Sequence, residues 1–160
     1  MTLRSWELAC AVALLLTGSA CATAPELRDP QPPAADEVLA ELARRSTLPE
    51  SELHAMLADC GADDQHLYVC AFQAFVAKDI VWKRLVAERI WAMPACSVLI
   101  ESRVARLERM RGEACHRTAE DAQVEGTIAA AMEASCAADT TNTMIGELSR
   151  ITHCVARANR

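Results

Sequence analysis

Residues 63–93, DDQHLYVCAFQAFVAKDIVWKRLVAERIWAM, form the stretch from which the fold can be predicted most directly. Asp63 is suited to cap the start of a helix, and the proline that follows Met93 favours a turn. Between them, apolar residues recur at three- and four-residue spacing, which places them on one side of a helix. They form two neighbouring stripes, Leu67, Cys70, Ala74, Ala77, Val81 and Leu85 beside Tyr68, Phe72, Phe75, Trp82, Val86 and Ile90. This pattern predicts a long central helix with a wide apolar surface.

Two shorter helical patterns precede this stretch. Asp36 is suited to cap a helix that ends at about Arg45. Thr47 is suited to cap a second helix that has Pro49 in its first turn, where proline is tolerated. This second helix is expected to end near Cys60, because a glycine follows directly.

A helical pattern also follows the turn after Met93. It runs from Cys96 to about His116, with apolar residues on one side. Residues 117–126 are polar and contain Gly126, so we expect a loop or a frayed helix start there. The last helical pattern runs from residue 128 to residue 155, and residues 139–143, DTTNT, are poor helix formers that favour a kink within it.

The composition favours the same fold class. Apolar residues make up 52% of the 160-residue chain, but only 4% of it is aromatic. Alanine, which is abundant here, is the best helix former, whereas strands are rich in aromatic and β-branched residues. The sequence therefore predicts an all-α fold, a small antiparallel bundle of three main helices with short helices at its N-terminal side. The formal net charge of −6 argues against a nucleic-acid partner, which requires clustered Lys and Arg.

Residues 1–20 are typical of a bacterial signal peptide. Leu8 to Leu16 form an apolar run that is too short to cross a bilayer, which takes about 20 residues, but suits a signal-peptide core. Gly18-Ser19-Ala20 are the small residues that a signal peptidase requires, and Cys21 follows at once. The segment resembles a lipobox, which implies that Cys21 becomes the lipidated first residue. A soluble periplasmic protein, cleaved after Ala20 without lipid, is the alternative.

The predicted domain organisation follows from this leader. Residues 21–35 contain four prolines and are expected to form an extended tether behind the lipidated cysteine. Residues 36–160 are expected to form the helical domain. The chain would then be anchored to a membrane by lipid and face the periplasm, and Ala22 after the cysteine would direct it to the outer membrane where sorting follows that residue.

The eight cysteines are expected to act as disulfide staples, because an exported chain meets an oxidising compartment. Cys10 would leave with the leader and Cys21 would carry lipid, so an even number remains. Cys96 and Cys154 are the first predicted pair, because antiparallel helices bring them to the same end. The other four are expected to gather at the opposite end and form two bridges whose pairing the sequence leaves open, namely Cys60, Cys70, Cys115 and Cys136.

No catalytic residue, metal ligand set or cofactor is predicted. The spacings typical of zinc and haem sites, such as C-x-x-C and H-x-x-x-H, do not occur. The chain also lacks the G-x-S-x-G and H-E-x-x-H motifs and a glycine-rich phosphate loop. We therefore expect a binding or structural protein and not an enzyme.

The cysteine framework resembles that of the LprI-type family of small bacterial envelope proteins, one branch of which is described as lysozyme inhibitors. The resemblance covers roughly residues 60–150, and it departs from the family pattern at Trp82-Lys83, Leu107 and Met144. The matching positions are Cys60, Cys70-Ala71, Asp79, Arg111, Cys115, Gly126-Thr127, Cys136, Thr141 and Glu147-Leu148. The resemblance implies a small helical envelope domain, in which Asp79 and Arg111 form either a structural ion pair or part of a binding site.

The function expected from these features is binding of a protein partner in the cell envelope. Lysozyme, a basic protein that attacks the cell wall, is the candidate implied by the resemblance, and an acidic surface would attract it. Glu120, Asp121 and Glu125 are the candidate contacts, because they lie in the least regular stretch of the domain. The alternative is a structural or assembly lipoprotein without inhibitor activity, which would leave apolar residues such as Trp82 or Trp91 exposed for its partner.

Overall fold

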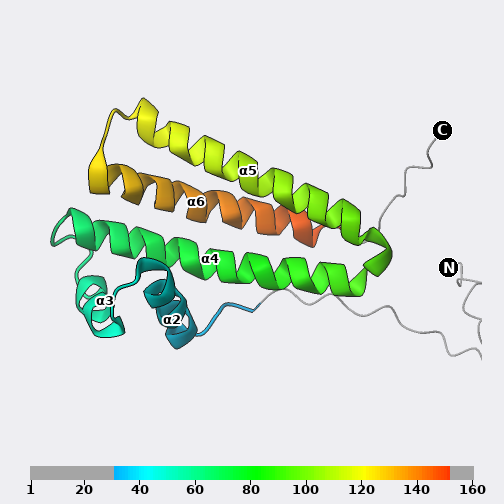
Figure 1. Cartoon of the computed structure of the whole chain (residues 1–160), viewed down its shortest axis with the longest axis horizontal. Helices are drawn as coiled ribbons and strands as arrows, with labels where there is room; N and C mark the ends of the chain where they lie inside the picture. Colours follow the sequence, from blue (N-terminus) through cyan, green and yellow to red (C-terminus); the bar gives the residue numbers. More distant parts are fainter. Residues whose placement is uncertain (1–30, 152–160) are drawn as a thin grey trace, which may run out of the picture.

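The computed structural model describes residues 31–151, and this part of the chain is helical without strands. The predicted leader, the predicted lipidation site Cys21 and the disulfide candidate Cys154 lie outside the described residues. Long antiparallel helices lie side by side, and two short helices cover one flank of the bundle (Figure 1). The elements are α2 (Ala35–Ser46), α3 (Glu50–Leu57), α4 (Asp64–Ala92), the 3-10 turn η1 (Pro94–Cys96), α5 (Ser97–Asp121) and α6 (Gly126–Ser149). The predicted all-α bundle is thereby confirmed.

Helix α4 is the central element, as predicted. Its N-cap is Asp63, whose Oδ1 accepts hydrogen bonds from the backbone N–H groups of Gln65 and His66, both at 2.9 Å. The helix ends at Ala92, and Pro94 opens the 3-10 turn that leads into α5. One side of α4 packs on α6, and another side packs on α2 and α3.

The predicted helix caps before α4 are wrong. Asp36 lies in the first turn of α2, where its charge complements the helix dipole, and the N-cap is Ala34. Thr47 does not cap α3 but ends α2, in the left-handed conformation with φ 61°. Pro49 is the N-cap of α3 instead, since its fixed φ leaves it extended before the first helical turn.

The expected loop over residues 117–126 is also wrong, because α5 continues to Asp121. Ala119 is buried, so packing holds this last stretch in place. His116 and Glu120 pair at 3.3 Å across one turn, which adds local support. The connection to α6 is only residues 122–125, and α6 is continuous through residues 139–143 without the expected break.

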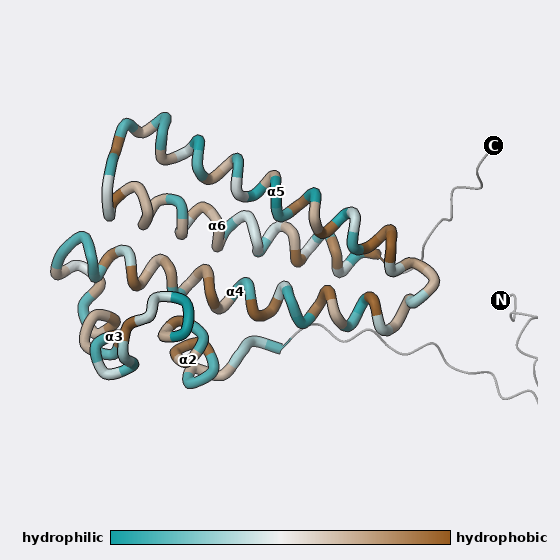
Figure 2. The backbone as a smooth tube through the Cα atoms, in the orientation of Figure 1, coloured by the Kyte–Doolittle hydropathy of each residue, from teal (hydrophilic) through white to brown (hydrophobic). Residues whose placement is uncertain are grey.

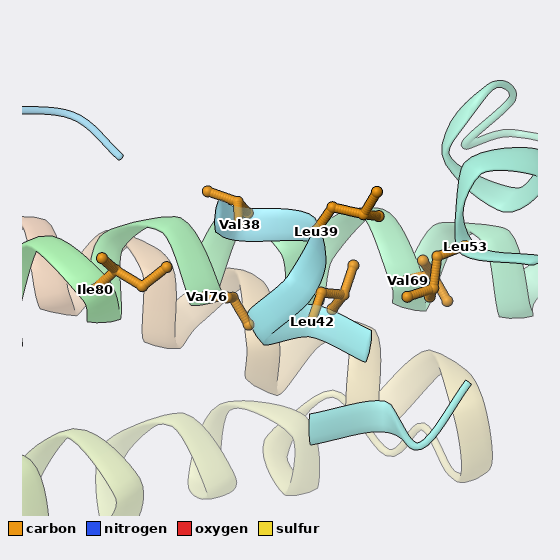
Figure 3. Packing of buried hydrophobic residues seen from close by; sticks show 7 residues of the cluster. All are labelled: Val38, Leu39, Leu42, Leu53, Val69, Val76 and Ile80. Carbon is orange, nitrogen blue, oxygen red and sulfur yellow. The ribbon is translucent and has the colours of Figure 1, made fainter. Parts of the chain in front are cut away.

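The core consists of two apolar clusters strung along α4. In the first, residues of α2 and α3 pack against the N-terminal half of α4, as Figure 3 shows. In the second, the C-terminal half of α4 packs against the beginning of α5 and the end of α6. Figure 2 shows apolar residues recurring along α4 and α6, whereas α5 is mostly hydrophilic beyond its first turns. The first cluster is Val38, Leu39, Leu42, Leu53, Val69, Val76 and Ile80, and the second is Trp82, Leu85, Cys96, Ile100, Met144 and Leu148.

Helix α6 presents a stripe of mostly small residues to α4. The spacing of three and four residues keeps the stripe on one face, and small side chains let the two helix backbones approach closely. At its end, Arg89 of α4 donates to the carbonyl oxygens of Ser149 at 3.1 Å and Ile151 at 3.2 Å. A cation at a helix C-terminus is favourable. The buried residues of the stripe are Ala131, Ala134, Ala138, Thr141, Met144 and Leu148.

Disulfides staple the bundle, as expected for this framework. Cys60 pairs with Cys70, which ties the connection after α3 to the first turns of α4. Cys115 pairs with Cys136 and joins α5 to α6. Cys96 is disulfide-bonded as well. Its predicted partner, Cys154, lies outside the described residues.

Candidate functional site

A groove of about 340 Å³ opens between α4 and α5. Figure 1 shows these two helices meeting at their common turn and diverging toward the opposite end, with α6 between them. The groove lies in the divergent part, so α4 and α5 form its walls and α6 its floor. Its lining is Tyr68, Phe72, Phe75, Glu108, Arg111, Gly112, Cys115, Ala130, Glu133, Ala134 and Ala137.

The α4 wall of the groove is aromatic. The ring of Tyr68 stacks on that of Phe72 with centroids 5.6 Å apart, and the ring of Phe72 lies 6.2 Å from that of Phe75. The sequence pattern predicts these rings as one of the two stripes that make α4 apolar. The structure leaves them half-buried, so one side of each contributes to packing while the other lines the groove.

The floor and the opposite wall leave room for a ligand. The floor is made of alanines from α6, whose side chains end at Cβ. Gly112 faces the groove from α5, and a Cβ atom placed there would meet no atom within 4 Å. A larger side chain at this position would therefore project into open space and fill the groove without disturbing the helix.

Arg111 closes the inner end of the groove. Its guanidinium lies over the ring of Phe75 at 5.0 Å from the centroid, and Nη1 donates to Oγ1 of Thr141 at 2.8 Å. The same Nη1 lies 3.6 Å from Oδ1 of Asp79. Thr141 is fully buried, and its hydroxyl donates a hydrogen bond to the carbonyl oxygen of Ala137 at 2.6 Å.

Asp79 is the anion of this network and is itself buried. Arg45 of α2 donates to its Oδ2 at 2.6 Å, and Lys83 lies 3.0 Å from the same oxygen. Burial alone would raise the pKa of Asp79, but the hydrogen bonds from Arg45 and Lys83 outweigh it and hold the pKa below its usual range. The two residues singled out by the resemblance, Asp79 and Arg111, are thus brought together in an ion pair that joins α2, α4 and α5.

Carboxylates stand at the rim of the groove. Glu108 accepts a hydrogen bond from Nε1 of the buried Trp82 at 2.9 Å. Glu133 lies 2.8 Å from Nδ1 of His116, and Glu120 lies 3.3 Å from Nε2 of the same ring. The hydrogen bond to Glu133, followed by the charges of Glu120 and Glu133, raises the pKa of His116.

The three acidic residues predicted as partner contacts lie together at the α5–α6 connection, and we call them the acidic corner. Glu120 and Asp121 occupy the last turn of α5, and Glu125 is the N-cap residue of α6. All three are exposed. They do not line the groove, but Glu120 is connected to its rim through His116.

Gly126 and Thr127, which also belong to the resemblance, lie at the start of α6. Gly126 is the first residue of α6 and has φ +65°, a left-handed conformation that glycine adopts without strain. Thr127 follows it on the exposed side of the first turn. Neither residue lines the groove.

The groove itself was not predicted from the sequence. The aromatic spacing on α4 predicts a core face, and nothing local to α4 indicates that α5 diverges from it. The one available signal is Gly112, a glycine inside a helical pattern, which often has a packing or functional reason.

Within residues 31–151, no group of three or more His, Cys, Asp or Glu side chains is arranged to hold a metal ion. None of the helices in this range combines the length and the apolarity needed to cross a bilayer. What the groove offers is a concave surface with aromatic faces, a half-buried arginine and rim carboxylates. Such a surface can hold an apolar or cationic group of a ligand.

Comparison of the chain with known protein families, with curated proteins and with solved structures finds no match. The resemblance to the LprI-type family therefore stays a prediction.

Proposed function

We propose that this chain is an exported, membrane-anchored binding protein that holds a protruding segment of a basic partner protein in the groove between α4 and α5. The observation that carries this proposal is the groove itself, a concave site with an aromatic wall and carboxylates at its rim. Chemistry on the partner is not part of the proposal, since the groove presents binding groups and no nucleophile paired with a base.

The groove favours a cationic side chain flanked by apolar ones. An arginine or lysine side chain is attracted to the faces of Tyr68 and Phe72, since Arg111 already lies over the ring of Phe75. Each such contact contributes about 0.5–2 kcal/mol depending on how much water is removed. Glu108 and Glu133 supply the counter-charge. Arg111 shares the carboxylate of Asp79 with Arg45 and Lys83, so the carboxylates at the rim also have to offset its charge toward an incoming cation.

The acidic corner adds longer-range attraction. Glu120, Asp121 and Glu125 are exposed, and Glu120 is connected to the rim through His116. Charges of this kind increase the rate of association with a basic partner more than they increase the final affinity, and added salt weakens the effect.

Export is supported by the disulfides. Bridges such as Cys60–Cys70 and Cys115–Cys136 persist in oxidising compartments and are rare in the cytosol. Together with the leader-like residues 1–20 and Cys21, they favour a lipoprotein that faces the periplasm.

Lysozyme is the partner to test first. It is basic, and one branch of the LprI-type family that the chain resembles is described as lysozyme inhibitors. The assay measures hydrolysis of cell walls by lysozyme in the presence of the oxidised mature chain at micromolar concentration. We expect inhibition that weakens as salt is added, and that falls by about tenfold or more in the variant Glu120→Lys/Asp121→Lys/Glu125→Lys.

A matched control carries the same change of charge away from both the acidic corner and the groove, Asp36→Lys/Glu88→Lys/Glu101→Lys. It should inhibit within about twofold of the wild type at physiological salt, since exposed charges beyond a Debye length are screened. Equal losses in both variants would show that only net charge matters. Absence of inhibition by the wild type would refute the inhibitor function and favour the alternative, an assembly lipoprotein whose partner is another envelope protein.

A further inference from the structure

The turn between α4 and α5 carries exposed large apolar side chains close together. Residues 90–100 read IWAMPACSVLI and contain no charged side chain, although charged residues make up 24% of the whole sequence. Arg89 and Glu101 flank this run. We call residues 90–100 the apolar tip.

Much of the apolar tip is exposed. Trp91 has 78% of its surface accessible, Val98 77% and Leu99 56%, whereas Ile100 is buried in the core. Figure 2 shows the apolar colouring gathered where α4 and α5 meet. Exposed apolar clusters of this kind mark interaction sites. Tryptophan in particular is enriched where a protein meets the interfacial layer of a bilayer, because its ring is amphipathic.

The chain enters the domain near the same end. Glu37, in the first turn of α2, forms an ion pair with Arg84 of α4. Trp91 lies seven residues further along α4, which corresponds to about 10 Å. Figure 1 shows residues 31–34, directly before α2, running toward the end at which α4 and α5 meet. From Cys21 to Ala34 the chain reaches at most about 45 Å, so a lipid on Cys21 would keep the whole domain within that distance of the membrane, and the exposed apolar side chains then decide which end contacts it.

We propose that the apolar tip docks into the interfacial layer of the membrane that carries the lipid anchor, with Trp91, Val98 and Leu99 inserted. This inference rests on the proposed attachment at Cys21. The two ends of the bundle would then have different functions, one in membrane contact and one in partner binding. They are far apart, since α5 runs from the tip to the acidic corner over 25 residues, or about 37 Å. The acidic corner and the groove would then face away from the bilayer.

The apolar tip is expected to bind the membrane stably only when the protein is already tethered to it. Three side chains bury too little apolar area for stable binding alone, but a short tether raises their effective concentration at the surface. Because the tip contains no lysine or arginine, docking should not depend on anionic lipids.

The test uses residues 22–160 with an N-terminal histidine tag in place of Cys21, attached to phosphatidylcholine vesicles through a nickel-chelating lipid. Brominated phospholipid in these vesicles quenches tryptophan that enters the interface. Residues 22–160 contain two tryptophans, and Trp82 is fully buried and should not respond. We expect quenching of Trp91, unchanged when phosphatidylglycerol is added. The variant Val98→Ser/Leu99→Ser should lower the docked fraction about tenfold.

Met110→Ser is the matched control, because Met110 is 53% exposed on α5 but lies outside the tip. It should leave the quenching unchanged. Absence of quenching in the wild type, or equal quenching in the Val98/Leu99 variant, would overturn the proposal. So would shielding of Trp91 from acrylamide before vesicles are added, which would show that another part of the protein covers the tip. This assay requires neither lipidation in cells nor lysozyme. A negative result would therefore refute docking of the tip without bearing on partner binding in the groove.

Discussion

The buried carboxylate of Asp79 connects α2, α4 and α5, because it pairs with Arg45, Lys83 and Arg111. The packing of these three helices should therefore depend on its charge. The variant Asp79→Asn keeps the shape of the side chain but leaves cations without their counter-charge. We expect the free energy of unfolding in urea to fall by about 3 kcal/mol, the cost typical of breaking a buried ion pair from one side. The variant Lys83→Met should cost less than about 1 kcal/mol, because Lys83 is exposed.

The same carboxylate gives the fold a pH dependence of known sign. The pKa of Asp79 is lowered in the folded protein, so its contribution is present above the ordinary pKa of aspartate and is lost as the pH falls through the folded pKa. The free energy of unfolding, measured by circular dichroism in urea at a series of pH values, should therefore differ between wild type and Asp79→Asn at neutral pH and converge in strong acid. A constant difference at all pH values would contradict this assignment.

His116 reports on the rim of the groove. Its pKa is raised, first by the hydrogen bond to Glu133 and then by the charges of Glu120 and Glu133. Titration of the imidazole signals by NMR should give a pKa above 6.5, and Glu133→Gln should bring it back toward that value. An unchanged pKa in Glu133→Gln would show that the ring does not face Glu133 in solution.

At the scale of helices, the bridge between Cys115 and Cys136 fixes α5 against α6 beside the groove. It closes a loop of about 20 residues, and such a bridge typically contributes about 3 kcal/mol. The variant Cys115→Ala/Cys136→Ala should lose about this much stability in denaturant unfolding, and its affinity for the partner should fall more than that of Met110→Ser. Unaltered stability would indicate that packing alone positions α5.

The helices could be predicted where local pattern and packing agree. Asp63 marks the start of α4 by capping it, and Pro94 marks its end because proline has no N–H donor. Both effects are local, and the structure confirms both ends. Thr47 and residues 117–121 were predicted wrongly, because neighbouring helices decide their conformation. Ala119 is held by burial that the polar composition around it does not reveal.

The candidate site was less predictable than the helices. The acidic corner could be found because a run of carboxylates is visible in one segment, although its backbone is helical where a loop was expected. The groove depends on how far α5 diverges from α4, which is a property of three helices together. Half-burial of Tyr68, Phe72 and Phe75 cannot be distinguished from full burial by spacing alone.

Considered as a whole, the molecule is a rod with two chemically different ends. The apolar tip lies where α4 and α5 meet, and the acidic corner lies about 37 Å away at the other end of α5. The groove opens between these helices toward the acidic end. This arrangement would present the binding surface to the periplasm while the tip holds the rod upright on the membrane.

The central claim is that the groove is the binding site, and the most direct test compares Gly112→Leu with Gly146→Leu. Both glycines lie in helices, and a Cβ at either would meet no atom within 4 Å, so each variant should gain up to about 1 kcal/mol of stability. Only Gly112 lines the groove. Calorimetric titration with lysozyme should give binding weakened at least about tenfold for Gly112→Leu and unchanged for Gly146→Leu. Equal affinity in the two variants would contradict the claim.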